Sequence, residues 1–184
     1  MFTIQAGIKL LGFVILLSFS RGTVNAQNEP RYRLLTGEAA DRVAIKTLID
    51  DYAHHADRRE TQQQASLFTP DGAIEVFRAE PGVSKPTAVI KGQTDLENSF
   101  KTLSRYEVTM HVNGQSTLAI QGDTATGETY CLAHHLLKEK GQRLLIVMGI
   151  RYYDTFVRLN QHWYFAKRQL IFDWTDRRPS MPQK

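Results

Sequence analysis

Cysteine is nearly absent from this 184-residue sequence, which contains only Cys131. A lone cysteine cannot form an intramolecular disulfide, so the fold must rest on its own core, and this residue most simply packs there as a small apolar group. Blocks of lysine and arginine interleaved with aromatic residues are also absent, although the formal net charge is +4. We therefore expect no nucleic-acid partner.

Motifs for several common chemistries are missing as well. The sequence has no G-x-S-x-G elbow, P-loop, dinucleotide fingerprint or H-E-x-x-H zinc spacing. Adjacent histidines occur at 54–55 and 134–135, but neighbours on a helix or strand point to different sides and should not chelate one metal. We expect neither a cofactor nor a metal, which leaves proton transfer by histidine, carboxylate, tyrosine and arginine.

The first 26 residues have the features of a secretory signal peptide. Lys9 supplies a positive charge, residues 10–17 form a short apolar run, and residues 24–26 (Val-Asn-Ala) are followed by Gln27. The run is too short to cross a bilayer comfortably. We predict cleavage after Ala26, a secreted or periplasmic location and no membrane contact afterwards. The alternative is a retained N-terminal anchor.

Without that segment, 158 of the 184 residues remain, which is the size of one domain. We expect a linker over residues 27–36, a single domain over residues 37–176 and a disordered tail over residues 177–184. Apolar residues spaced three or four apart predict a helix over residues 38–59. Two shorter helices are expected over residues 61–68 and 94–103.

Strands are expected to fill most of the remaining sequence. Their predicted ranges are residues 73–77, 88–90, 107–112, 116–121, 124–138, 144–158 and 163–174. Helices followed by an antiparallel meander indicate an α+β fold. Because strands this long must bend, we predict a curved, mostly antiparallel sheet wrapped on the N-terminal helices, a cone-shaped α+β barrel with a cavity.

Strand alternation places a charge, Arg168, on the more apolar face of the last strand. A buried guanidinium needs a carboxylate, a dipole or an anionic ligand, and Asp154 and Asp57 are its candidate structural partners. The opposite face of the sheet would suit an interface in a homodimer or homotrimer. The residues expected to be exposed there are Tyr153, Val157, Phe165 and Ile171.

Asp57 and His111 are the candidates for proton transfer. Asp57 lies near the end of the first predicted helix, where the helix dipole disfavours an anion and a protonated histidine would offset the cost. Beside Arg58 and Arg59, it also fits an ordinary surface charge cluster. His111 shares a strand face with Thr109, a polar pattern that equally fits a solvated side chain.

Five segments together resemble the SnoaL-like branch of the nuclear transport factor 2-like superfamily. They are residues 41–53, 57–59, 65–72, 122–128 and 151–156. Within that branch, the sequence is similar to the group that contains scytalone dehydratase and hexachlorocyclohexane dehydrochlorinase. The resemblance implies the cone-shaped fold, but membership of a fold does not select a reaction.

The resemblance also implies roles for four residues. The dehydrochlorinase abstracts a proton with an Asp–His dyad, and a lysine and an arginine stabilise its departing anion. The matching positions here are Asp57 and His111 for the dyad and Arg168 for the arginine. Tyr52 replaces the lysine; it would otherwise be a core residue, and a tyrosine suits polarising a carbonyl or protonating a hydroxyl leaving group.

We therefore expect a cofactor-free lyase or isomerase that acts on a small, largely apolar organic molecule. His111 would be the general base, Asp57 would fix its tautomer, and Arg168 with Tyr52 would stabilise developing negative charge. The expected pocket residues are Tyr152, His135, Thr129, Cys131, Ala133, Met148, Ile150, Leu170 and Phe172. The alternative is a non-catalytic protein that binds a small molecule in the same pocket.

Overall fold

A computed structural model describes residues 36–181 of the chain. The predicted signal peptide and nearly all of the predicted linker lie outside the described residues. The helices are α1 (Glu38–Arg58), α2 (Thr61–Ser66) and α3 (Gln93–Phe100), which continues into the short 3-10 helix η1 (Lys101–Arg105). The strands are β1 (Phe68–Phe77), β2 (Ala88–Lys91), β3 (Val108–Gln121), β4 (Thr124–Glu139), β5 (Gln142–Leu159) and β6 (His162–Pro179).

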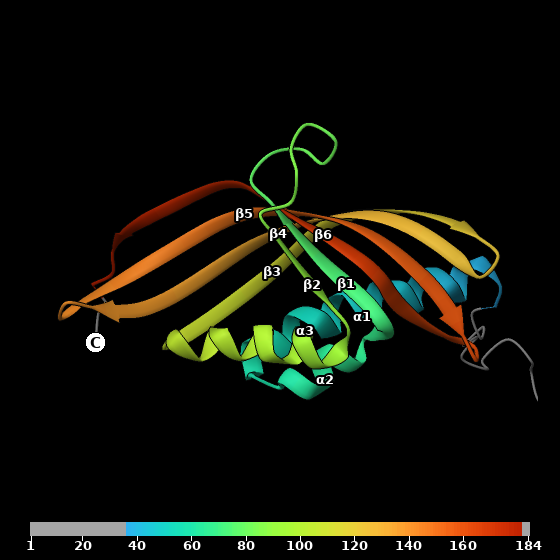
Figure 1. The fold of residues 1–184 in the computed structure, drawn as a ribbon, viewed down its shortest axis with the longest axis horizontal. Coiled ribbons are helices and arrows are strands. Elements are labelled where there is room, and N and C mark those ends of the chain that lie inside the picture. The colour runs from blue at the N-terminus through green and yellow to red at the C-terminus, as the bar shows by residue number, and fades with distance from the viewer. Residues whose placement is uncertain (1–35, 182–184) are drawn as a thin grey trace, which may run out of the picture. The chain divides into compact units, whose positions relative to one another are not determined.

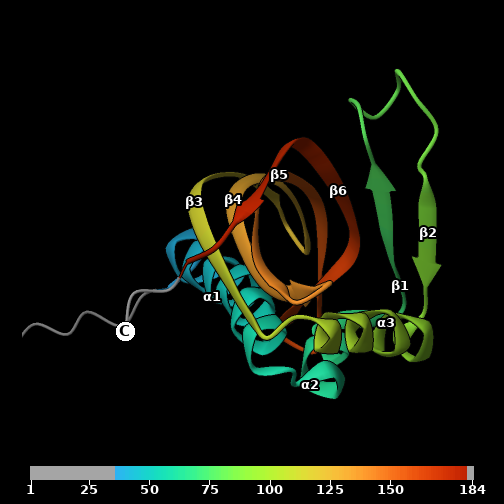
Figure 2. The same ribbon diagram turned by 90° about the vertical axis from the view of Figure 1, so that its left-hand side faces the viewer.

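The described strands form a single sheet in the order β2-β1-β6-β5-β4-β3. Every neighbouring pair is antiparallel except β1 and β6, which run parallel. The long strands curve, and the helices lie against the concave side (Figures 1 and 2). The predicted α+β cone with a mostly antiparallel sheet is confirmed, although the sheet is not closed, because β2 and β3 remain as edges.

Helix α1 follows directly from its sequence pattern. Glu38 and Asp41 occupy its first turn and Arg58 its last, which complements the helix dipole. Its buried stripe consists of Ile45, Leu48, Ile49, Tyr52, Ala53 and Ala56. The helix ends at Arg59, which adopts the left-handed conformation with φ of 63°. This ending places the last turn of α1 against β3.

The core lies between α1 and the concave face of the sheet, with Tyr52 at its centre. The Tyr52 ring meets four other aromatic rings edge-on, at centroid distances of 5.9 to 6.1 Å. These rings belong to Phe68, Phe100, Tyr152 and Phe165. Edge-to-face packing of this kind adds to the burial of apolar area and fixes the position of α1 over the sheet.

A bulge in β6 changes which of its residues face the core. Phe156 of β5 pairs with Phe165, but the preceding Thr155 pairs with Lys167, so Ala166 is an extra residue. Phe165 and Arg168 therefore share the concave face, and both have 0% exposure. The prediction that Phe165 would be exposed at an interface was wrong, because simple alternation does not anticipate a bulge.

Ile171 is a second correction to the predicted interface. It is buried on the opposite face, where it pairs across the parallel junction with Phe77, itself buried. Tyr153 and Val157 are half-buried. The apolar side chains that are exposed on this face lie farther along the sheet, and they are Val108, Met110, Val112, Tyr130, Leu132 and Trp174. Oligomerisation stays a prediction.

The polar face of β3 is the face that meets α1. Two predicted short strands form one strand here, with an irregular register between Asn113 and Ser116. The Asn113 side chain donates hydrogen bonds to the Ile49 carbonyl and to Asp50, both at 3.2 Å. The polar side chains of β3 thus hold the edge strand to the helix, which turns His111 inward.

The chain beyond residue 176 is partly ordered. Arg177, Arg178 and Pro179 continue β6 and pair with residues 144–146 of β5. The predicted disordered tail therefore began too early, and the domain extends at least to Pro179. A proline is tolerated there because the end of a strand needs no further N–H donor. Within residues 36–181, no helix combines the length and apolarity needed to span a bilayer.

Candidate active site

A cavity of about 410 Å³ opens between the concave sheet, the end of α1 and the α3–η1 segment. Its apolar lining consists of Ile74, Val76, Ile90, Phe100, Leu103, Ile146, Met148, Ile150, Leu170 and Phe172. Its larger polar residues are Tyr52, Gln64, Arg78, Arg105, Tyr106, His111, His135 and Tyr152. An apolar cavity of this size with a few converging polar groups is typical of a small-molecule site.

Asp57 and His111 meet beside this cavity. Asp57 is in the last turn of α1, and its Oδ1 accepts a hydrogen bond from His111 Nδ1 at 2.7 Å. Its Oδ2 accepts a second one from the backbone N–H of His111 at 2.9 Å. The His111 side chain is 9% exposed and that of Asp57 is 25% exposed. The helix-borne carboxylate thus holds both the ring and the backbone of the histidine.

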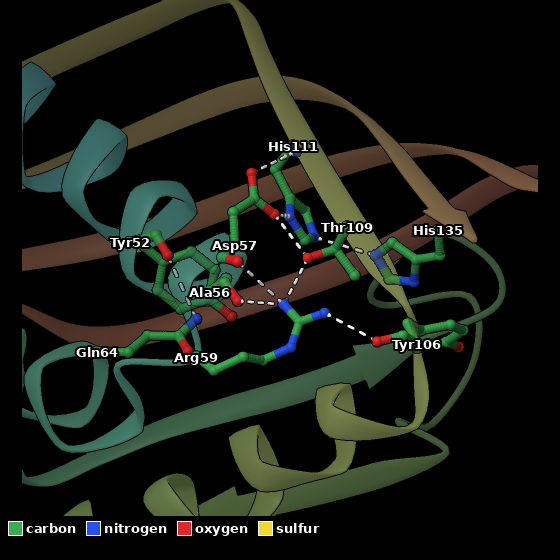
Figure 3. Close-up of polar contacts among 9 residues, drawn as sticks. All are labelled: Tyr52, Ala56, Asp57, Arg59, Gln64, Tyr106, Thr109, His111 and His135. Atoms are coloured by element: carbon green, nitrogen blue, oxygen red, sulfur yellow. Dashed lines mark hydrogen bonds and ion pairs between the residues drawn. The ribbon is translucent and has the colours of Figure 1, made fainter. Parts of the chain in front are cut away.

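Thr109 and Arg59 complete a polar chain around the carboxylate (Figure 3). The Thr109 hydroxyl donates to Asp57 Oδ1 at 2.9 Å and accepts from Arg59 Nη1 at 2.6 Å. The same Arg59 nitrogen donates to the Ala56 carbonyl at 2.7 Å, in the last turn of the helix, where this carbonyl also accepts from the Arg59 backbone N–H at 3.3 Å. Arg59 therefore links the end of α1 to β3, a role that its place in a run of charges did not reveal.

These contacts fix the protonation of the pair. A carboxylate can only accept, so His111 must carry its proton on Nδ1, which leaves Nε2 with the lone pair. Partial burial alone would raise the pKa of Asp57, but the side-chain and backbone hydrogen bonds from His111 and the hydrogen bond from the Thr109 hydroxyl lower that pKa below its usual value. Asp57 is therefore ionised at neutral pH, and its hydrogen bond fixes the orientation of the His111 ring.

His135 lies next to His111 on the neighbouring strand β4. The two Nε2 atoms are 3.4 Å apart, and the His135 ring packs on Tyr106 with centroids 4.3 Å apart. Burial, followed by the proximity of His111 and by the positive charge of Arg59, lowers the pKa of His135 to about 4. His135 is therefore neutral at pH 7, and its buried Nδ1 has no partner within the described residues.

Tyr52 and Tyr152 lie on the floor of the cavity. Both are buried, at 8% and 3% exposure, and their rings meet edge-on. Burial raises the pKa of Tyr52 and raises that of Tyr152 further, so both hydroxyls stay protonated at neutral pH. Tyr52 also serves as the centre of the aromatic core.

Arg168 is not among the residues that line the cavity. Its Nε and Nη2 each donate to one oxygen of Asp154 at 2.8 Å, and neither residue's side chain is exposed. The guanidinium also lies 4.2 Å from the centroid of the Tyr52 ring and 4.0 Å from that of Tyr152. The two tyrosines thus lie over the pair, and the predicted role of Arg168 in stabilising an anion is corrected to a structural one.

Burial acts against both charges of this pair. It would lower the pKa of Arg168, but the Asp154 carboxylate raises it, so the guanidinium stays charged. Burial raises the pKa of Asp154, and Arg168 opposes that shift. Because two short, parallel hydrogen bonds join the groups, the pair is ionised at neutral pH. This pairing is the structural alternative that the sequence had left open.

Six of the predicted pocket residues line the cavity, namely His135, Met148, Ile150, Tyr152, Leu170 and Phe172. Thr129, Cys131 and Ala133 do not line it. All three point to the concave side, but they are at most 3% exposed and lie in the core. Thr129 pairs across the strands with Tyr152, whose large ring separates this part of the sheet from the cavity. Strand alternation predicted the correct face but not what covers it.

Gln64, Arg78, Arg105 and Tyr106 are cavity residues that the sequence did not single out. Gln64 is 1% exposed, and its amide donates to the Tyr52 carbonyl at 3.3 Å, while its Oε1 has no partner within the described residues. A glutamine in a short helix carries no signal for burial. Arg78, Arg105 and Tyr106 lie at or just after the end of a strand or helix, where the sequence does not indicate which way a side chain points.

One group of side chains has donors close enough for a metal ion. The ligand atoms of His54, His55 and Glu60 lie within 4.8 Å of one another, beside the end of α1. The expectation that adjacent helical histidines cannot approach a common point is therefore wrong, because their rings turn toward the same side. Glu60 already accepts hydrogen bonds from His55 at 2.7 Å and from Arg58 at 3.0 Å. None of the three lines the cavity.

Known proteins resemble this chain both in sequence and in fold. Residues 37–169 match the SnoaL-like domain family. An uncharacterized protein of Mycobacterium tuberculosis is 29% identical over 138 residues, which is 75% of this chain and 89% of that protein. Two solved structures with this fold extend the comparison.

A scytalone dehydratase-like protein of Novosphingobium aromaticivorans aligns with a TM-score of 0.64 and 22% identity, over 74% of this chain and 87% of its own. The hexachlorocyclohexane dehydrochlorinase LinA-type3 of Novosphingobium barchaimii aligns with a TM-score of 0.62 and 22% identity, over 77% and 90%. At these identities, the two alignments establish a shared cone-shaped fold.

Proposed function

Because the chain belongs to the SnoaL-like domain family, we propose that it is a lyase or isomerase that works by proton transfer without a cofactor. The observation that carries the proposal is the hydrogen bond of 2.7 Å between Asp57 and His111 Nδ1, beside an apolar cavity. Structures of a scytalone dehydratase-like protein and of a hexachlorocyclohexane dehydrochlorinase share this fold. Elimination of water or of hydrogen halide requires the removal of a proton from the substrate, which a histidine base can carry out.

His111 is the general base of the proposed reaction. Its Nε2 lone pair takes a proton from a carbon next to an electron-withdrawing group of the substrate. The imidazolium that forms is stabilised by the ionised Asp57, whose two oxygens already hold the ring and the backbone. The substrate displaces His135, whose contact of 3.4 Å with His111 is long for a hydrogen bond.

Two tyrosines are the proposed donors to the negative charge that develops on the substrate. The hydroxyls of Tyr52 and Tyr152 are protonated at neutral pH and belong to residues of the cavity floor. A fixed donor that faces developing charge in a dry site lowers the barrier more than the same donor in water. Loss of water or of a halide completes an elimination, and return of the proton to another carbon completes an isomerisation.

Exchange of carbon-bound hydrogen in deuterium oxide tests this proposal without knowledge of the natural substrate. We would incubate the full-length chain with a cyclic ketone, a β-hydroxy ketone and hexachlorocyclohexane, and follow deuterium uptake and product formation by NMR. The native protein should accelerate exchange or elimination, and His111→Ala should remove at least about 10²-fold of that rate. Equal rates for both proteins would refute the base.

The alternative function is binding without turnover. The same cavity would then hold an organic ligand, and His111→Ala would change affinity modestly while no product forms with any compound. Recovery of an unaltered ligand with the purified protein, together with no exchange above the uncatalysed rate, would establish this alternative over the enzyme.

A further inference from the structure

Two arginines stand at the rim of the cavity without any acidic partner. Arg78 follows the end of β1, and Arg105 ends η1, so they approach from different elements. Within residues 36–181, neither guanidinium forms an ion pair, and the cavity lining includes no aspartate or glutamate. The cavity therefore carries two positive charges that the described protein does not neutralise.

Both guanidiniums are positioned by aromatic side chains of the cavity wall. Arg78 lies 4.4 Å from the ring centroid of Phe172. Arg105 lies 4.7 Å from the ring centroid of Tyr106 and donates to the Tyr106 hydroxyl at 2.6 Å. Stacking on an aromatic face restricts a guanidinium and leaves its edge free to bind an oxyanion.

The acidic residues nearest in sequence are engaged elsewhere. Glu80, two residues after Arg78, pairs with Arg151 and approaches the Tyr153 hydroxyl at 3.3 Å. Glu107, two residues after Arg105, accepts a hydrogen bond from Arg143 at 2.5 Å. These carboxylates are therefore not free to neutralise the two arginines of the rim.

The positive charge of Arg105 also acts on a histidine inside the cavity. Burial is the first cause of the low pKa of His135, the positive charges of Arg59 and Arg105 lower it further, and the Asp57 carboxylate opposes the shift. A cationic rim above an apolar interior favours a ligand that combines a negative group with a hydrocarbon body. A wholly apolar ligand would leave the rim charges without any complement.

We propose that the substrate of this cavity is an organic acid whose carboxylate binds Arg78 and Arg105 while its apolar body reaches His111. This inference rests on the proposed function, because it takes the same cavity as the substrate site, and it replaces the expectation of a largely apolar molecule. A carboxylate bound in this way accepts charge-assisted hydrogen bonds from both sides of the rim.

Paired probes of equal shape test the charge requirement. We would measure binding of naphthoate and of the neutral naphthamide to the full-length chain by isothermal titration calorimetry. Naphthoate should bind at least about tenfold more tightly, and the double variant Arg78→Gln/Arg105→Gln should lose that preference without changing naphthamide affinity more than about twofold. The preference should also weaken at high salt.

Removal of two other positive charges is the matched control. Lys85 and Lys91 are exposed residues of the β1–β2 region, outside the cavity lining, and Lys85→Gln/Lys91→Gln should keep the preference. Equal binding of both probes, no binding of either, or equal losses in both double variants would overturn the inference. Circular dichroism would show that each variant is folded.

The His111→Ala variant separates this inference from the proposed function. It should keep the preference for naphthoate over naphthamide, because both arginines of the rim remain. A native preference for naphthoate with no hydrogen exchange on any compound would refute the enzyme and support the anion site. Exchange on neutral ketones without a naphthoate preference would support the enzyme and refute the anion site.

Discussion

Asp57 binds His111 twice, through the ring Nδ1 at 2.7 Å and through the backbone N–H at 2.9 Å. The two bonds join the last turn of a helix to an edge strand 54 residues later in the chain. Because one carboxylate fixes both the strand position and the imidazole tautomer, the orientation of the His111 ring depends on how α1 packs against β3.

Replacement of Asp57 by asparagine should disable the base while leaving the fold intact. The amide oxygen can still accept from His111 Nδ1, but the amide nitrogen cannot accept from the His111 backbone N–H, and the neutral group cannot stabilise the imidazolium that forms during proton transfer. We expect the rate of hydrogen exchange or elimination to fall about 10²- to 10⁴-fold. The control is Asp51→Asn, on the same helix but outside the cavity lining, which should retain the native rate. A native rate in Asp57→Asn would contradict the assigned role.

Breaking the Arg168–Asp154 pair should strongly lower the free energy of unfolding. Its effect on ligand binding in the cavity should be smaller, because Arg168 does not line the cavity. Because both side chains are fully buried, Arg168→Met leaves an unpaired carboxylate and should lower the free energy of unfolding by about 3 to 5 kcal/mol. The double variant Arg168→Met/Asp154→Leu should recover most of this loss. Denaturant titration of the single and double variants measures this loss. If the double variant recovers no stability, the unpaired carboxylate is not the main cause of the loss.

His135 should make the protein less stable in mild acid. Its pKa is about 4 in the folded state against an ordinary 6.5, so the unfolded chain binds the proton first as pH falls. Stability from the neutral ring is thus complete above pH 6.5 and is lost between pH 6.5 and 4.

The matched variant is His135→Gln, which cannot titrate. Between pH 7 and 4, the native protein should lose about 1 to 3 kcal/mol more than this variant in chemical unfolding. If the stability of the two proteins changes in parallel with pH, the pKa of His135 is not lowered in the folded state.

Gly127→Ala should strain the junction of β3 and β4. A Cβ there would lie 2.8 Å from the Thr117 carbonyl oxygen and 2.7 Å from a methyl carbon of Leu118. The backbone oxygen cannot move aside without disturbing the ladder, so we expect a loss of about 1 to 3 kcal/mol.

Gly114→Ala on the same strand pair is the control for this change. Its Cβ would meet only ordinary contacts, at 3.6 Å or more from Tyr130, so its stability should stay within about 0.5 kcal/mol of the native value. Equal thermal stability of the two variants would contradict the steric argument.

Local patterns predicted the elements well because they depend on local chemistry. The stripe of α1 from Ile45 to Ala56 matches the predicted helix, which ends one residue from the expected position. The three long strands were extended at their ends, most of all β6, whose pairing with β5 continues to Pro179. Strand ends depend on the partner strand, which sequence does not show.

Some residues of the proposed site could be predicted from the sequence, and others could not. Asp57 and His111 were named from the sequence, and the structure brings them into contact. Arg168 was known to need a partner, but the choice of Asp154 depended on the pairing of β5 with β6. Arg78 and Arg105 were not singled out, because exposed arginines are common.

Patterns in the sequence were enough to predict the helical and strand periodicity, the α+β class, the family and the need of Arg168 for a negative partner. The identity of that partner, the direction in which β3 faces and the set of residues around the cavity depend on packing in three dimensions. The reason is physical: periodicity reports the local face of each element, whereas a bulge such as that at Ala166 and the packing of α1 arise from contacts between distant segments.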